Sequence, residues 1–321
     1  MPPAPATSPT ARSARIWAAL GIVYVVWGST YFAIRVAIQT LPPFLMAATR
    51  FLVAGGILFG LTAPRGDRAG DPLGPTQWRA TAIVGGALLM GGNGGVVWAE
   101  QRIPSGAAAL LIATVALWMT LLDRLIFGRR LPPRAVAGIG MGLAGLALLV
   151  GRIDSGGIDP LGAAICALAS LSWAAGSLYA RTAPLPRRPL VATSMEMLAG
   201  GAFLLLVSVA IGEPRTAHTA SFSAHSLLAL GYLIVFGSLI AFSAYVWLLR
   251  HAPISLVATY AYVNPVVAVF LGWALLDEPV TTRMAVAGTI IVCAVALIAS
   301  AHVPAPDEEV AAEPARAAGS R

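Results

Sequence analysis

The sequence predicts an all-α membrane protein with ten transmembrane helices in two inverted five-helix repeats. Three observations lead to this fold class. First, 58% of the 321 residues are hydrophobic, 11% are charged and the mean hydropathy is +0.79, so polar side chains are too few to coat a soluble globule. Second, ten apolar segments each approach the roughly 20 helical residues needed to cross the hydrocarbon core. Third, the second half of the chain repeats the first.

The ten segments are helical candidates because such long apolar runs lack the period-two alternation of a lipid-facing barrel strand. In chain order they lie near residues 16–38, 44–63, 78–98, 105–126, 134–151, 158–180, 190–211, 226–248, 253–275 and 283–302. Proline-containing turns separate several of them, at residues 41–43, 131–133, 183–186 and 278–279. Proline ends one helix or opens the next, so these turns mark the expected ends.

The repeat shows as a constant offset between the halves. Three residues recur 149 positions later, in the pairs Trp98 and Trp247, Pro104 and Pro253, and Arg134 and Arg283. Upstream the offset slips slightly, since Trp27 aligns with Trp173 and residues 51–56 align with residues 196–201. Internal symmetry in a hydrophobic chain indicates a transporter. The expected organisation is a first repeat over residues 15–152, a second over 153–302, and disordered Ala/Pro-rich tails at 1–14 and 303–321.

The arginines predict the orientation in the membrane. With the N-terminus in the cytoplasm, fourteen arginines fall on the inner side and five on the outer side, which is a positive-inside distribution with both termini cytoplasmic. Because five spans per repeat is an odd number, the second repeat must then enter from the opposite side. The inner arginines are Arg12, Arg15, Arg65, Arg68, Arg79, Arg129, Arg130, Arg134, Arg181, Arg187, Arg188, Arg250, Arg316 and Arg321, and the outer ones are Arg35, Arg102, Arg152, Arg215 and Arg283.

Enzyme signatures are missing from the sequence. It contains no GxxxxGK[ST] phosphate loop, HExxH, CxxC or GxSxG motif, and its four histidines lack ligand spacing. We therefore expect no catalytic residue, cofactor, metal or nucleic-acid partner, and a gradient must supply the energy for transport. Cys166 and Cys293 fall inside expected spans and are interpreted as packing residues.

Ionisable residues inside the spans are the first site candidates, because each one is costly in the bilayer. Arg50 and Glu196 lie one residue apart in the repeat alignment, so the inverted fold can direct both toward one cavity. They are predicted to contact substrate, with Glu196 as the proton-coupling carboxylate. The alternative is a structural ion pair or a snorkelling arginine. Glu100, near a span end, is interpreted as an interfacial solvated carboxylate, with a coupling group as the alternative. Asp123 and Arg124 are interpreted as a local pair or a contact to a neighbouring helix.

Aromatic and amide side chains are the other candidates for a substrate-binding wall. Residues four apart share a helix face, and three such pairs are Trp27 with Tyr31, Trp173 with Ser177, and Tyr260 with Asn264. These faces can stack a flat or cationic substrate, although plain helix packing is the alternative. Asn93 lies between two glycine pairs, which predicts a hinge or a polar contact in the third span or merely close helix packing.

Several runs resemble the EamA-type transporters of the drug/metabolite transporter superfamily, and most of all its bacterial inner-membrane permease branch. They are residues 26–32 (VWGSTYF), 50–51, 91–95 (GGNGG), 99–101, 104–108 and 261–266 (AYVNPV). The resemblance covers nearly the whole chain. It implies a ten-helix inverted-repeat carrier in the bacterial inner membrane that exports a small metabolite or toxic compound, with protons as a candidate coupling ion.

One departure from the family pattern concerns the fourth span. Ala116 stands where the family usually has proline, whereas the aligned position of the second repeat keeps Pro265. The fourth helix is therefore expected to be straighter than the ninth. The alternatives to a transporter are a membrane receptor that binds a metabolite and moves nothing, and a flippase for a lipid-linked sugar. A homodimer, proton antiport and facilitated diffusion all stay open from the sequence.

Overall fold

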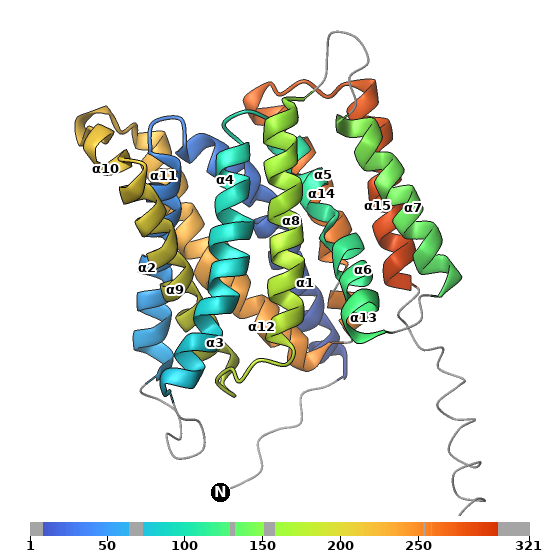
Figure 1. The fold of residues 1–321 in the computed structure, drawn as a ribbon, viewed down its shortest axis with the longest axis horizontal. Coiled ribbons are helices and arrows are strands. Elements are labelled where there is room, and N and C mark those ends of the chain that lie inside the picture. The colour runs from blue at the N-terminus through green and yellow to red at the C-terminus, as the bar shows by residue number, and fades with distance from the viewer. Residues whose placement is uncertain are drawn as a thin grey trace, which may run out of the picture.

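The computed structural model describes residues 9–63, 73–128, 132–150, 158–252, 254–257 and 259–300. Within these ranges every regular element is a helix, and the helices stand side by side in one bundle (Figure 1). Nine of the described helices are long and apolar enough to cross a membrane, and Tyr260–Leu276 is apolar but shorter. The predicted all-α polytopic membrane fold is confirmed, and the ends of most transmembrane helices fall close to the predicted ends.

The first half of the chain supplies five spans. α1 (Pro9–Ala37) and α2 (Pro43–Thr62) are continuous helices. The third span joins α3 (Pro75–Gly85), a π-helical segment η2 (Gly86–Gly94) and α4 (Gly95–Ala99). The fourth span is α5 (Ser105–Ala113) followed by α6 (Val115–Phe127), and the fifth is α7 (Pro133–Val150).

The second half follows the same order. α8 (Pro160–Ala180) and α9 (Pro189–Ala210) are continuous, and the short α10 (Glu213–Thr216) and the 3-10 helix η3 (Thr219–Ser221) connect them to the next span. The eighth span again contains a π-helical segment, η4 (Leu233–Ile240), between α11 (Ala224–Tyr232) and α12 (Ala241–His251). α13 (Ile254–Val257) and α14 (Tyr260–Leu276) precede α15 (Thr282–Ser300).

One sequence-based expectation about local structure is corrected, and the interruption of the fourth span is an additional finding. α1 begins at Pro9, so residues 9–14 are helical rather than part of a tail, while residues 1–8 and 303–321 lie outside the described residues. The fourth span is interrupted at Thr114, and the ninth is also divided, between α13 and α14, although α14 itself runs through Pro265. The Thr114 hydroxyl donates to the Leu111 carbonyl at 2.6 Å and lies 3.1 Å from the Ser170 hydroxyl. A side chain that competes for backbone carbonyls can bend a helix without proline.

Equivalent helices of the two halves pack against each other. α2 packs on α9, α7 on α15, and α5 on α14, while α1 contacts the eighth span and α8 contacts the third. Neither half is thus a separate globule. α1 begins at the lower end of the bundle in Figure 1 and α8 at the upper end, so the halves enter from opposite ends. The upper end is defined here as the one where α2, α5, α8, α11 and α15 begin.

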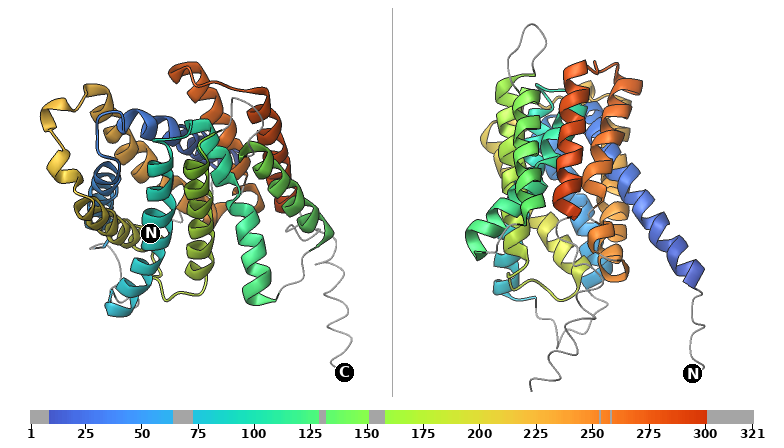
Figure 2. Two further views of the ribbon diagram at one scale, coloured as in Figure 1. Left: turned by 45° about the horizontal axis from the view of Figure 1, so that its top comes forward. Right: turned by 90° about the vertical axis from the view of Figure 1, so that its right-hand side faces the viewer.

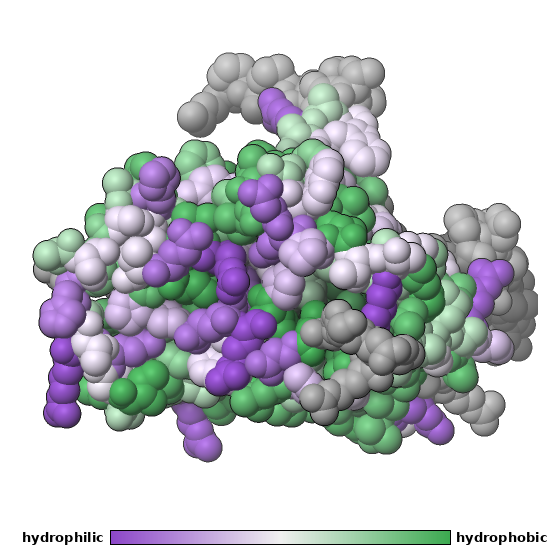
Figure 3. All heavy atoms as spheres, turned by 90° about the horizontal axis from the view of Figure 1, so that it is seen from above, coloured by the Kyte–Doolittle hydropathy of each residue, from purple (hydrophilic) through white to green (hydrophobic). Residues whose placement is uncertain are grey.

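The surface matches a bilayer environment. Large apolar side chains point outward, among them Leu228 (72% exposed) and Leu125 (69% exposed), because lipid rather than water surrounds them. Figure 2 shows α1 leaning out of the bundle at its N-terminal end, where Trp17 is 58% exposed. Viewed onto the upper end, hydrophilic residues gather across the middle of the face and apolar residues dominate much of its rim (Figure 3).

Glycine sets the closest helix crossing near Glu196. A Cβ on Gly85 of α3 would overlap the carbonyl oxygen of Glu196 on α9, and a Cβ on Gly200 would lie 2.7 Å from the carbonyl oxygen of Gly85. Small residues let backbones approach in this way in membranes. The crossing fixes the backbone of Glu196 against the third span.

We expect Gly85→Ala to lower the thermal stability of the purified protein, because the added methyl group forces these backbones apart at a cost of about 1–3 kcal/mol. Gly56→Ala is the matched control, since nothing lies within 4 Å of a Cβ at Gly56. Fluorescence-detected size-exclusion chromatography after heating measures both variants. Equal melting temperatures for the two would contradict the close crossing.

Candidate functional site

Each half carries one π-helical segment, and the two occupy equivalent spans. The turn of a π-helix is wider than that of an α-helix, and such segments are frequent at functional sites. The Ala87 carbonyl of η2 accepts a hydrogen bond from the Ser172 hydroxyl at 2.8 Å, and the Gly237 carbonyl of η4 accepts one from Trp27 Nε1 at 3.2 Å. In both cases the donor belongs to the first helix of the other half. The irregular backbone thus lies where the halves meet.

Arg50 is buried beside η4. Its side chain projects from α2, and its Nε donates to the Ser238 hydroxyl at 2.9 Å, while its guanidinium carbon lies 4.7 Å from the centre of the Phe51 ring. The residue is only 3% exposed, and its Nη1 has no hydrogen-bond partner in the described part of the chain. A buried charge is costly unless it is paired. This free donor is therefore suited to a ligand anion.

An aromatic cluster lies next to Arg50. The Trp27 ring has centroid distances of 5.1 Å to Phe242, 5.1 Å to Tyr245 and 5.3 Å to Tyr260. Gly237 links the cluster to Arg50, because Trp27 bonds its carbonyl and a Cβ on Gly237 would lie 3.2 Å from Arg50 Nη2. We call Trp27, Arg50, Ser238, Tyr245 and Tyr260 the central site. It combines a fixed cation with flat apolar surfaces.

Asn264 lies at the edge of the central site but its amide is occupied. The residue is 7% exposed, and with its amide nitrogen turned toward the backbone it donates to the carbonyls of Tyr24 (3.2 Å) and Tyr260 (3.3 Å). The contact with Tyr24 joins α14 to α1, and the contact with Tyr260 lies within α14. Tyr31, one turn beyond Trp27 on α1, packs against the core around α5 and α8.

Asn93 and Trp173 both lie at the other π-helical segment. A Cβ on Gly92 would lie 2.8 Å from the Trp173 ring, and one on Gly95 would lie 2.7 Å from Ala169, so the glycines bring η2 and α4 close to α8. The Asn93 side-chain oxygen is buried and has no hydrogen-bond partner among the described residues. Close packing and an unused polar group occur together here. Ser177 lies one turn along α8 from Trp173 and is partly buried.

Glu196 does not pair with Arg50. Arg50 is the eighth residue of α2, counted from the upper end, and Glu196 is the eighth residue of α9, counted from the lower end. Glu196 is partly exposed, and no hydrogen bond or ion pair of its side chain is found within the described ranges. The structure thus brings Trp27, Arg50 and Tyr260 together, and it leaves Glu196 apart from them.

These observations place two π-helical segments and a buried arginine where the halves of a ten-helix membrane bundle meet. The profile of the EamA-like transporter family matches the chain twice, at residues 15–151 and 160–300. The chain belongs to the EamA-like transporter family. This family membership and the apolar helices make it a multi-pass membrane transporter, as the sequence runs indicated.

Relatives of this EamA-like transporter span almost its full length. The uncharacterized inner membrane transporter YedA of Escherichia coli (strain K12) is 42% identical over 287 residues, which are 88% of this chain and 90% of YedA. A probable amino-acid metabolite efflux pump of the same strain is 24% identical over 279 residues, covering 81% of this chain and 86% of the relative. A crystal structure with 21% identity superimposes with a TM-score of 0.59 over 91% of this chain and 98% of that chain, which supports the fold.

Glu100 corrects the sequence interpretation. It follows α4 at the upper end of the EamA-like transporter, but it is 0% exposed and neither carboxylate oxygen has a hydrogen-bond partner among the described residues. It is therefore not an interfacial solvated group. The start of α8 covers this region, since a Cβ on Gly162 would lie 2.9 Å from Ile103 and 3.1 Å from Arg102. A charge near the end of a span costs little free energy only where solvent reaches it.

Two carboxylates at the upper end went unnoticed in the sequence. Glu278 accepts hydrogen bonds from the Ser105 amide at 2.9 Å, the Ser105 hydroxyl at 2.9 Å and the Gly106 amide at 3.3 Å, at the start of α5. Glu213 accepts from the amides of Phe44 (3.2 Å) and Leu45 (2.8 Å), at the start of α2. Carboxylates satisfy the free amides of helix N-termini. Because each caps a helix remote in sequence, no local pattern reveals the role.

Two ion pairs among the described residues of the EamA-like transporter lie apart from the central site. Asp123 forms an ion pair at 3.3 Å with Arg181, which directly follows α8. Asp123 thus contacts a neighbouring helix instead of pairing with Arg124, which donates to the Gly128 carbonyl at 2.8 Å. Arg102 pairs with Asp159 at 3.1 Å. Two backbone amides at the start of α8 and the Arg102 guanidinium lower the pKa of the exposed Asp159 carboxyl. Cys166 is buried and Cys293 is exposed, and both are free thiols.

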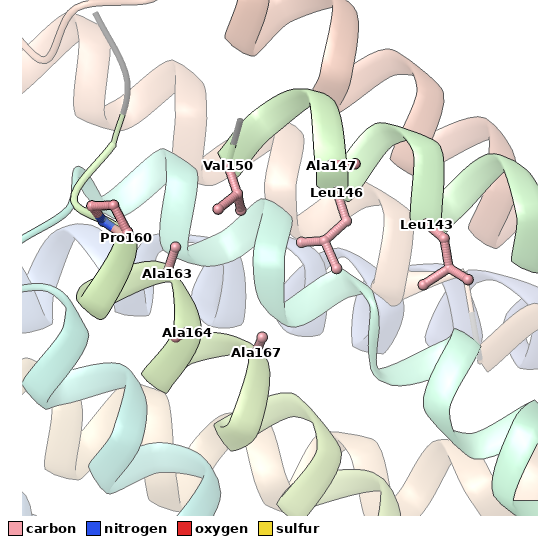
Figure 4. Close-up of a pocket in the computed structure, with 8 residues that line it drawn as sticks. All are labelled: Leu143, Leu146, Ala147, Val150, Pro160, Ala163, Ala164 and Ala167. Carbon is pink, nitrogen blue, oxygen red and sulfur yellow. The ribbon is translucent and has the colours of Figure 1, made fainter. Parts of the chain in front are cut away.

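A pocket of about 330 Å³ lies between α7 and α8, apart from the central site (Figure 4). Its lining side chains are all apolar: Leu143, Leu146, Ala147, Val150, Pro160, Ala163, Ala164 and Ala167. A site for a polar metabolite needs a few hydrogen-bonding groups, and this pocket offers no such side chain. Among the described residues no group of three His, Cys, Asp or Glu side chains is placed to hold a metal ion.

Proposed function

We propose that the chain is a secondary transporter of the bacterial inner membrane that exports a small metabolite by gradient-driven alternating access. The observation that carries the proposal is Arg50, a buried guanidinium with an unpartnered Nη1 beside η4 and the aromatic side chains of Trp27 and Tyr260. A guanidinium binds a carboxylate or another planar anion well. We therefore propose a substrate with a carboxylate and a flat or apolar body.

The name of one relative, a probable amino-acid metabolite efflux pump, supports this substrate class. Packing between the halves supports alternating access, because α1 and α8 each contact a π-helical span of the opposite half. A displacement of one half against the other would change the surroundings of the central site. Inverted repeats of this kind rock about a central binding site in other carriers.

The coupling proposal concerns the energy source. The sequence has no nucleotide-binding loop, so a gradient is the proposed source, with proton antiport through Glu196 as first choice and facilitated diffusion as second. Glu196 is a carboxylate inside a span without a partner in the described chain, a feature typical of proton relays. The flippase alternative is less supported, because the pocket between α7 and α8 has no polar side chain for a sugar headgroup.

A substrate screen tests the proposed function. Strains that overexpress the wild-type chain, overexpress Arg50→Gln, or lack the gene are compared by mass spectrometry of the growth medium. Carboxylate-bearing metabolites should accumulate in the medium with the wild-type chain only. Identical media from the wild-type and Arg50→Gln strains, at equal protein amounts in the membrane, would refute export through the central site.

The orientation proposed from the arginines makes a separate prediction. Both termini should be cytoplasmic, with Arg65 and Arg187 inside and Arg152 outside, because positively charged loops stay in the cytoplasm. Alkaline phosphatase fused after Gly156 should be active and a green fluorescent protein fused there should be dark. Fusions at Arg187 are the matched control with the opposite pattern. Fluorescence at Gly156 would overturn the orientation.

A further inference from the structure

Glu100 is the most deeply buried carboxylate that the central site leaves unexplained. Its exposure is 0%, and both side-chain oxygens lack a hydrogen-bond partner in the described part of the chain. The carboxylates of Glu213 and Glu278 differ from it, because each accepts several hydrogen bonds at a helix start. An unpartnered ionised carboxylate is very costly in such a place. Glu100 is therefore suited to carry a proton.

Titratable groups on several elements interact electrostatically with Glu100. They are Tyr31 and Arg35 of α1, Cys166 of α8 and Glu278 in the segment after α14. Arg35 donates to the backbone carbonyl of Glu100 instead of its carboxylate. Burial and the Glu278 carboxylate raise the pKa of Glu100 well above its usual range, and Arg35 opposes them. Arg35 thus leaves the carboxylate itself without a hydrogen bond.

Tyr31 couples Glu100 electrostatically to the central site. Tyr31 interacts electrostatically with Glu100 on one side and with Tyr260 on the other. Tyr260 in turn packs against Trp27, with ring centroids 5.3 Å apart, and against Tyr245 at 5.7 Å. The protonation state of Glu100 can therefore affect the packing of α1 against α14. Both helices border the central site.

We propose that Glu100 is a second proton-binding site of the transport cycle, placed between the upper end and the central site. Its role in transport rests on the proposed function, but its proton binding does not. The step is a reversible protonation: one carboxylate oxygen takes a proton from water when the helices around it open, and it returns that proton to water on the other side. In the structure Glu100 is 0% exposed, so water does not reach it in this conformation.

Infrared spectroscopy of the protein in lipid tests the proton site without a substrate. Wild type at neutral pH should show the carbonyl stretching band of a protonated carboxyl group, and Glu100→Gln should lose a component of that band. Asp123→Asn is the matched control, since Asp123 is paired with Arg181, and it should leave this component unchanged. Glu100→Asp keeps a titrating group and should retain a shifted component, which covers the case in which the Gln variant fails to fold. A band that is intact in Glu100→Gln would overturn the proposal.

Proton movement tests the role in transport. Proteoliposomes loaded with a pH-sensitive dye receive a mixture of the twenty amino acids, and the change in internal pH is recorded. Wild type should show substrate-dependent proton movement, and Glu100→Gln should lose it. If wild type shows no response, the proposed function fails for these probes, while the infrared result still decides the proton site. A lost infrared component with unchanged proton movement would make Glu100 a structural acid and overturn its transport role.

Discussion

Replacement of Arg50 by Gln should weaken substrate binding roughly ten- to hundredfold, because hydrogen bonds to a charged group contribute about 1.5–3 kcal/mol. Gln keeps a donor that can reach Ser238, so the loss isolates the charge and the free Nη1. The half-saturating concentration for transport, measured with the exported metabolite found in the screen, should rise accordingly. The amount of folded protein should change little, since Nη1 has no partner among the described residues.

Two further variants give this prediction its controls. Arg50→Lys keeps the charge but loses the planar fork, so it should recover only part of the affinity. Ser238→Ala removes the hydrogen bond that orients Nε, and its effect should be smaller than that of Arg50→Gln. An unchanged half-saturating concentration in Arg50→Gln, with normal folding, would remove Arg50 from the substrate site.

The span positions could be predicted because they depend on local sequence. Apolar length and proline punctuation are properties of the segment itself, and proline stands in the first turn of α2, α3, α8 and α9. The interruption of the fourth span could not be predicted in this way. It involves the contact of Thr114 with Ser170 on α8, which depends on tertiary packing. Proline content alone therefore does not locate this interruption.

For the site residues too, local sequence predicts some positions and tertiary packing decides the others. Trp27 and Tyr260 could be selected from their depth in apolar spans, and the structure places them in one cluster. The burial of Glu100 depends on how α8 closes over the end of α4, and the cap formed by Glu278 joins residues 173 positions apart. Neither relation has a local sequence pattern. Whether a buried polar group finds a partner depends on tertiary packing, so the fold rather than composition decides its role.

The sequence predicts either a hinge or close helix packing for the GGNGG run, and these two roles do not exclude each other. Its glycines lie in and beside a π-helical segment, and a Cβ on Gly92 or Gly94 would lie 2.8 Å from Trp173 or Leu204, respectively. Adding methyl groups here would change the helix packing as well as the backbone flexibility. Transport by a Gly92→Ala, Gly94→Ala double variant thus reports on both properties together. Asn93 itself is better tested by replacement of its amide.

Glu196→Gln should abolish accumulation of substrate against its gradient while downhill exchange stays measurable. A gradient of one pH unit provides about 1.4 kcal/mol per proton, which supports roughly tenfold accumulation when one proton is exchanged per substrate. Gln keeps the shape and hydrogen-bonding capacity of Glu196 but cannot titrate. Because Glu196 has no partner in the described chain, the substitution should leave the folded structure intact. pH-driven uptake in proteoliposomes, normalised to protein amount, measures the loss.

The comparison with Glu196→Ala distinguishes coupling from a structural role. The backbone of Glu196 packs on Gly85 whatever its side chain is, so Ala should fold as well as Gln and should be equally uncoupled. Gly85→Ala, in contrast, should lower the amount of folded protein without uncoupling the molecules that remain. Full pH-driven accumulation by Glu196→Gln would exclude Glu196 as the coupling group and leave Glu100 as the remaining carboxylate candidate.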